Sequence, residues 1–225
     1  MPFQILTLKE RLAAAAFALT MGVTLMLGFL PMVNRFYGIV GPALPLPEPW
    51  TSYGERLFFP LVAAFFGWSL KYRETSQKPT SRLLAISLLP VALAWLFGVW
   101  NPHPEFWAHP QIAFWYLVCI PIGEEFLFRQ WFYRLTYRLW GNRFFTFTNP
   151  FPTPVFLSAV AFSLWHFQNW TDDAIGLVLF QVVYTFFTGL WLGTLRHETG
   201  RLWPSILAHF LINLASSIPL PAMLK

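Results

Sequence analysis

Charged residues are scarce in this chain, because Asp, Glu, Lys and Arg make up only 11% of its 225 residues. An average soluble domain has about 25%. A soluble core of this size would need more charged surface, so the composition argues against a soluble globular protein. Hydrophobic residues reach 56% and aromatic residues 20%. These fractions predict an all-α fold, in which residues 1–225 form a single transmembrane domain as a helical bundle in a bilayer.

Cysteine and aspartate are also scarce. The single cysteine, Cys119, excludes an internal disulfide. The aspartates, Asp172 and Asp173, are adjacent and lie in a predicted outer loop. No aspartate is therefore expected at membrane depth to orient a histidine, which argues against a Ser-His-Asp hydrolase.

Apolar stretches predict about seven membrane-spanning helices. Crossing a bilayer takes about 20 residues, and the first, third, sixth and seventh stretches are long enough alone. The other three reach this length when they are extended through neighbouring residues. The stretches are residues 12–33, 57–70, 83–100, 112–123, 155–165, 174–195 and 202–224.

The basic residues predict an orientation in the membrane. Only Arg35, Arg56 and Lys225 fall on the predicted outer side. The positive-inside rule therefore places the N-terminus in the cytoplasm. Because the basic residues flank helices instead of forming a basic face in water, no nucleic-acid partner is expected. The basic residues on the inner side are Lys9, Arg11, Lys71, Arg73, Lys78, Arg82, Arg134, Arg138, Arg143, Arg196 and Arg201.

A few strongly polar residues remain within the predicted spans. At about 1.5 Å per residue, Glu124 and His209 come about 12 and 11 Å from the inner membrane face. His166 and Asn213 come about 17 Å from it by the same rule. Polar side chains at one depth on three spans predict a shared interior pocket, because such residues are costly in lipid. The full set is Glu124, Glu125, Arg129, His166, His209 and Asn213, with Gln181 as a milder member.

The spacing within this set suggests that some of these residues are structural and others take part in chemistry. Glu125 and Arg129 stand at i and i+4, in the order that favours an ion pair on one helix face. Glu124 points about 100° away, so it is left to face a cavity and take a proton from water. His209 and Asn213, also at i and i+4, offer an imidazole and an amide that can hold a developing oxyanion. The alternative is structural: a buried ion pair and a polar link between helices.

Three motifs in these spans resemble those of one family. Residues 124–129, EEFLFR, resemble its EExxxR motif; residues 162–166, FSLWH, resemble its FxxxH motif; and residues 209–213, HFLIN, resemble its HxxxN/B motif. This is the CPBP family of CAAX-processing and bacteriocin-processing intramembrane proteases, which includes the Ras-converting endopeptidases. The resemblance covers the C-terminal half and predicts a motif-bearing catalytic core at residues 112–220.

The resemblance implies an endopeptidase that hydrolyses a peptide bond in a membrane-associated protein or peptide. By this resemblance Glu124 activates the attacking water and His166 assists, while His209 and Asn213 stabilise the oxyanion. The expected location is a multi-pass position in a prokaryotic cell membrane, with lipid and the substrate as partners. The residues that support the site would be Glu125, Arg129 and Phe162.

Alternatives remain at this point. A zinc-dependent protease could use Glu124, His166 and His209 as metal ligands. No cofactor is the preferred expectation, because Asn213 is a poor zinc ligand but a good oxyanion donor. A non-catalytic membrane scaffold or chaperone could keep the same fold. A proton-coupled transporter would need paired interrupted helices in two related halves, which the sequence does not show.

Overall fold

The computed structural model describes residues 5–24, 35, 90, 92, 94–96, 109–145, 151–171 and 174–217. These residues form helices and two isolated β-bridges, and no strand occurs among them. The all-α prediction is therefore confirmed for this part of the chain. The predicted span 57–70 lies outside the described residues, and spans 12–33, 83–100 and 202–224 lie only partly inside them. The count of seven spans and the cytoplasmic N-terminus stay predictions.

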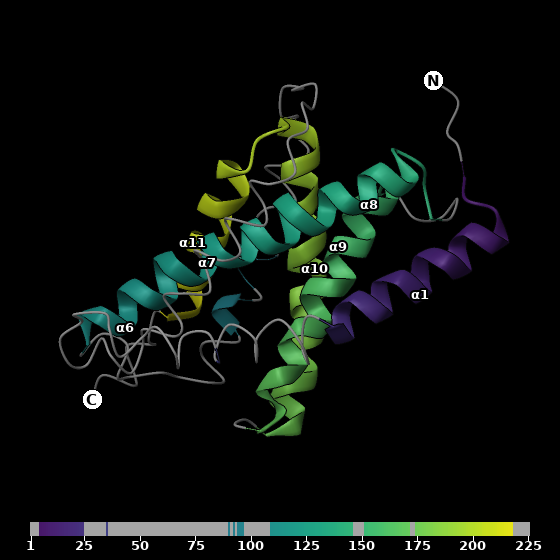
Figure 1. Cartoon of the computed structure of the whole chain (residues 1–225). Helices are drawn as coiled ribbons and strands as arrows, with labels where there is room; N and C mark the ends of the chain where they lie inside the picture. The colour runs from purple at the N-terminus through teal and green to yellow at the C-terminus, as the bar shows by residue number, and fades with distance from the viewer. Residues whose placement is uncertain are drawn as a thin grey trace.

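The longest helix runs without a break from Pro110 to Trp140 and is the long teal helix in Figure 1. Its 31 residues are long and apolar enough to cross a membrane. Two of its turns are π-helical, a geometry often found at functional sites. The second of these turns follows Glu124 and Glu125 directly. The segments are α6 (Pro110–Phe114), η3 (Trp115–Cys119), α7 (Ile120–Glu125), η4 (Phe126–Phe132) and α8 (Tyr133–Trp140).

The next two helices form the centre of the bundle. α9 (Thr153–Trp165) is apolar and packs along α10 (Ile175–Thr199), the second helix long enough to span a membrane. α9 ends at Trp165, and the chain then tightens into a 3₁₀ helix, η5 (His166–Thr171). At this end of α9 the backbone N–H of His166 bonds the carbonyl of Ser163, and the His166 ring bonds the carbonyl of Phe162, the acceptor that a continued α-helix would use.

Two further helices complete the described bundle. α11 (Trp203–Ser217) packs against α10 and against the long helix at η3 and α7. α1 (Leu8–Thr24), purple in Figure 1, lies against α9 on the opposite flank. The segment before α1 is held by the backbone N–H of Leu6, which donates to the carbonyl of Phe144 at 3.1 Å. An ion pair joins Glu10 to Arg143 at the same place.

Glycines allow α9 and α10 to approach closely. A Cβ at Gly189 would lie 3.0 Å from the Cα of Ala159, and one at Gly193 would lie 3.1 Å from Cγ1 of Val155. This small-xxx-small spacing is the one that membrane helices use to bring their backbones together. The contact matters for function because α9 and α10 form two of the walls described below.

Substitution of Gly189 by Val should push α9 away from α10. Overpacking of this kind costs about 1–3 kcal/mol, so Gly189→Val should lower the Tm of the purified protein in detergent micelles. Gly176 is a matched control on the same helix, because nothing lies within 4 Å of a Cβ built there. Equal Tm values for Gly189→Val and Gly176→Val would contradict the close packing.

Candidate active site

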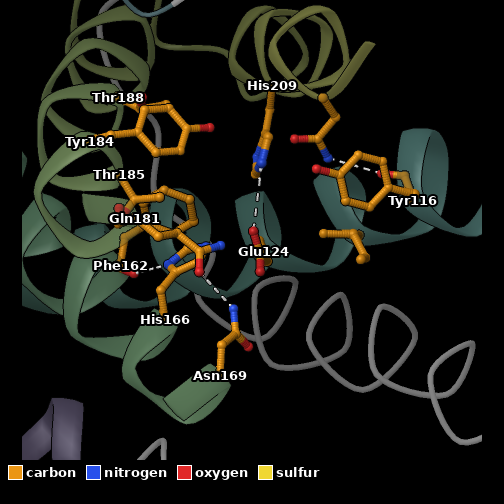
Figure 2. Close-up of a pocket in the computed structure, with 12 residues that line it drawn as sticks. Tyr116, Glu124, Phe162, His166, Asn169, Gln181, Tyr184, Thr185, Thr188 and His209 are labelled. Atoms are coloured by element: carbon orange, nitrogen blue, oxygen red, sulfur yellow. Dashed lines mark hydrogen bonds and ion pairs between the residues drawn. The ribbon is translucent and has the colours of Figure 1, made fainter. Parts of the chain in front are cut away.

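A cavity of about 180 Å³ lies where the long helix, α9 with η5, α10 and α11 meet (Figure 2). The sequence predicts seven catalytic and supporting residues, and five of these line the cavity: Glu124, Phe162, His166, His209 and Asn213. The other two, Glu125 and Arg129, are fully buried behind it. The remaining lining residues are Tyr116, Ile120, Asn169, Gln181, Tyr184, Thr185 and Thr188.

The His209 imidazole lies between two carboxylates of the long helix. Its Nδ1 is 2.9 Å from Oε1 of Glu125, and its Nε2 is 3.6 Å from Oε2 of Glu124. Figure 2 shows the His209 ring reaching from α11 toward Glu124 across the cavity. Because an ionised carboxylate only accepts hydrogen bonds, the hydrogen on Nδ1 is donated to Glu125. The Glu125 contact thus fixes the ring so that Nε2 faces Glu124.

Arg129 holds Glu125 from the other side. Its Nε is 3.4 Å from Oε2 of Glu125, and both side chains are 0% exposed. The guanidinium carbon lies 4.1 Å from the centre of the Phe162 ring, a cation–π contact. Arg129 Nη2 also donates to the carbonyl of Gly189 at 3.5 Å. Glu125 therefore lies between a guanidinium and an imidazole and is bound by both. Glu124, in contrast, lines the cavity.

His166 is oriented by the end of its own helix. Its Nδ1 lies 2.8 Å from the carbonyl oxygen of Phe162, four residues earlier. Because a carbonyl only accepts hydrogen bonds, Nδ1 carries the hydrogen, so the neutral ring has its lone pair on Nε2. The ring also packs edge-on against Phe162, at 4.8 Å between ring centres. His166 can therefore accept a hydrogen bond from a water molecule in the cavity.

Asn213 lies one turn after His209 on α11 and is 6% exposed. Its Nδ2 donates to the backbone carbonyl of Tyr116 at 2.9 Å. One of its two N–H groups therefore bonds the long helix, and the other can donate a hydrogen bond into the cavity. Four residues from three predicted spans thus line one cavity: Glu124, His166, His209 and Asn213.

α10 contributes a stripe of polar side chains to the cavity, and none of these residues belongs to the three motifs. Gln181 is its one member among the polar residues noted in the sequence, and its Oε1 accepts a hydrogen bond from Nδ2 of Asn169 at 2.8 Å. The other members are Tyr184, Thr185 and Thr188. Together they stand at i, i+3, i+4 and i+7, the spacing of one helix face. This polar periodicity within an apolar span is a signal that could have identified them.

The zinc-dependent alternative stays a prediction. Glu124, His166 and His209 share the cavity, but no group of three His, Cys, Asp or Glu side chains in the described ranges is placed to hold one metal ion. Glu124 and His209 are in direct contact, whereas the His166 ring is directed by the Phe162 carbonyl. The arrangement resembles a carboxylate–imidazole pair with oriented neighbours, which suits proton transfer to and from a bound water.

About half of the chain matches a known protein family. Residues 105–215 match the model of a protein family described as "Type II CAAX prenyl endopeptidase Rce1-like". The matched segment contains all three motifs and every residue that lines the cavity. No curated protein and no solved structure matches the chain.

Proposed function

Because the chain belongs to the Rce1-like CAAX endopeptidase family, we propose that it is an intramembrane endopeptidase in which Glu124 activates the attacking water. The family consists of integral membrane proteases that act on membrane-associated proteins, which agrees with the two membrane-capable helices of this chain. The contact of His209 with both Glu124 and Glu125 is the observation that best supports the glutamate mechanism.

The first step of the proposed reaction is attack by water. Glu124 removes a proton from the water, whose oxygen forms a bond to the carbonyl carbon of the scissile peptide. His166 Nε2 accepts a hydrogen bond from the same water and holds it in line. The electron pair of the broken carbonyl π bond moves to the carbonyl oxygen, which becomes an oxyanion.

The second step breaks the peptide bond. His209, as an imidazolium, donates its Nε2 hydrogen to the oxyanion, and the Asn213 amide donates a second hydrogen bond. When the oxyanion re-forms the carbonyl, the C–N bond breaks, and the proton held by Glu124 passes to the leaving nitrogen. The products at this point are a carboxylic acid and an amine, and the acid then gives its proton to the amine, which leaves a carboxylate and an ammonium group.

Glu125 and Arg129 support this chemistry electrostatically. With His209 protonated, the carboxylates of Glu124 and Glu125 are balanced by one imidazolium and one guanidinium. A buried cluster without net charge avoids the large penalty of an unpaired ion at low dielectric. Glu125 is therefore proposed to keep His209 in the donating orientation, and Arg129 to hold the Glu125 carboxylate in place.

The proposal includes the predicted place in the membrane. The cavity lies in the inner half of the bilayer, the chain crosses about seven times, and the N-terminus is cytoplasmic. The long helix and α10, which are both long and apolar enough to cross a membrane, contribute residues to the cavity, and this supports a lipid-anchored peptide as the substrate. The family description points to a prenylated C-terminal tail as the substrate class.

The test is cleavage of matched fluorogenic peptides by the full chain in detergent micelles. One peptide carries a farnesylated cysteine three residues from its C-terminus, and the other has the same sequence without the farnesyl group. We expect cleavage of the farnesylated peptide, and no loss of rate when a zinc chelator is added. Inactivation by the chelator that added zinc reverses would contradict the metal-free mechanism, and no cleavage of either peptide would favour a non-catalytic scaffold.

A further inference from the structure

Two carboxamide side chains meet at the cavity. Asn169, in η5, donates its Nδ2 hydrogen to Oε1 of Gln181, on α10, at 2.8 Å. Both side chains line the cavity, and Figure 2 shows the bond between them on the opposite side of Glu124 from Tyr116. Neither residue belongs to the three motifs, and the reaction steps above use neither of them. We refer to Asn169 and Gln181 as the amide pair.

The 3₁₀ geometry of η5 places the amide pair beside His166. A 3₁₀ helix has three residues per turn, so side chains three residues apart project in the same direction. Asn169 comes three residues after His166 in η5, which explains why both side chains line the cavity. Since the rise is about 2 Å per residue, the two are about 6 Å apart along the helix axis. In the proposed mechanism His166 holds the attacking water, so the amide pair lies one helical turn from the reacting atoms.

The amide pair keeps hydrogen-bonding groups for a ligand. A carboxamide has two N–H groups and a carbonyl oxygen that can accept two bonds. Within the described residues, the bond between Asn169 and Gln181 is the only hydrogen bond that either side chain makes. Both side chains are partly exposed. Nε2 of Gln181 is therefore available as a donor and Oδ1 of Asn169 as an acceptor.

A neighbouring donor and acceptor match the backbone of an extended peptide. A residue in an extended chain can exchange two hydrogen bonds with its neighbour, one through its N–H and one through its carbonyl. The amide pair offers the complementary groups, and the bond within the pair holds them in place before the peptide arrives, which lowers the entropy cost of binding. Main-chain recognition of this kind gives affinity without selecting a side chain.

We propose that the amide pair binds the main chain of the substrate: Oδ1 of Asn169 accepts the N–H of one substrate residue, and Nε2 of Gln181 donates to the carbonyl of the same residue. The inference rests on the proposed function, because it assumes a peptide substrate in this cavity. An extended peptide advances about 3.3 Å per residue, so the distance of about 6 Å along η5 places the bound residue about two residues from the scissile bond.

The test is the binding of farnesylated peptides in which one backbone amide at a time is replaced by an ester, which has no N–H to donate. All peptides keep the scissile amide and the farnesyl group, so their binding to the micelle is the same. Kd is measured by fluorescence anisotropy with the full chain carrying Glu124→Gln, so that the peptide is not consumed. One hydrogen bond changes Kd by about 3- to 10-fold, so we expect this increase for the ester about two residues from the scissile bond.

Substitutions of the amide pair show whether it makes this bond. In Asn169→Leu the acceptor is missing, so the amide and ester peptides should bind with equal Kd. Asn169→Ala is measured as well, so that the comparison does not depend on the folding of one variant. Gln181→Met should raise the Kd of the all-amide peptide by about 3- to 10-fold. Gln111→Met is the matched control, since Gln111 is partly buried on the long helix but does not line the cavity.

The proposal is overturned if no ester position raises Kd, if the ester effect persists in both Asn169 variants, or if Gln181→Met leaves Kd unchanged. Cleavage assays separate this inference from the proposed function. If the chain with native Glu124 cleaves peptides, Gln181→Met should raise KM and leave kcat nearly unchanged, because the lost contact is made before and during the reaction alike. If that chain cleaves no peptide, the proposed function fails, while the ester effect and its dependence on Asn169 still decide whether the amide pair binds a peptide main chain.

Discussion

Replacement of Glu124 by Gln should reduce kcat by about 100- to 10,000-fold, the range that a general base contributes. Gln has nearly the same shape as Glu but cannot take a proton from water. Its amide can still lie against Nε2 of His209, which is 3.6 Å from the carboxylate in the unsubstituted protein. The fold and the cavity should therefore persist, and KM should change little, because the lost interaction is one made in the transition state.

Glu198→Gln provides a matched control for this substitution. Glu198 is near the end of α10 and does not line the cavity, so the same chemical change should leave kcat unaltered. The Tm of both variants should be measured, because a Tm close to that of the wild-type protein shows that a variant is folded when its kcat is compared. A Glu124→Gln variant that keeps more than a tenth of the wild-type kcat would exclude Glu124 as the base.

Replacement of Arg129 by Leu should destabilise the protein by about 3–5 kcal/mol, the cost of breaking a buried ion pair by removal of one partner. Both Arg129 and Glu125 are 0% exposed, so the Glu125 carboxylate would lose its guanidinium with no water to replace it. The substitution also removes the cation–π contact with Phe162. Unfolding of the purified protein in mixed micelles with increasing denaturing detergent measures the effect.

A second substitution shows whether the charge is responsible. Glu125→Gln combined with Arg129→Leu removes both ions, so the double variant should be more stable than Arg129→Leu alone. Arg138→Leu is the control, since Arg138 lies on the same continuous helix but is exposed, and surface substitutions usually change stability by less than about 0.5 kcal/mol. A Glu125→Gln and Arg129→Leu variant as unstable as Arg129→Leu would show that lost packing, not the loss of the guanidinium beside the Glu125 carboxylate, causes the destabilisation.

Much of the cavity's composition could be predicted from the sequence. Glu124, His166, His209 and Asn213 stand out because strongly polar side chains are costly at membrane depth, and the structure has all four on one cavity. The Glu125–Arg129 pair follows from its i, i+4 spacing and is present as an ion pair. The catalytic roles of these residues stay predictions, which the substitutions above test.

Other features could not be predicted, because they depend on how helices are rotated and placed against each other. The contact of His209 with Glu125 as well as Glu124 joins two helices, and no spacing along the chain encodes it. The bond from Asn213 to the Tyr116 carbonyl depends on where α11 lies along the long helix. One further feature could have been predicted but was not: the polar stripe on α10, whose helical periodicity is visible in the sequence. Its members are Gln181, Tyr184, Thr185 and Thr188.

In the proposed mechanism, the position of Glu124 on the cavity wall also affects how the product leaves. Peptide hydrolysis leaves a new carboxylate beside Glu124, which is again an anion once its proton has passed to the leaving amine. Two unit charges of the same sign repel by about 4 kcal/mol at 4 Å with an effective dielectric of 20. By the proposed mechanism, the residue that activates the water would therefore also repel the product, and the freed carboxyl terminus should depart toward water instead of inhibiting the next turnover.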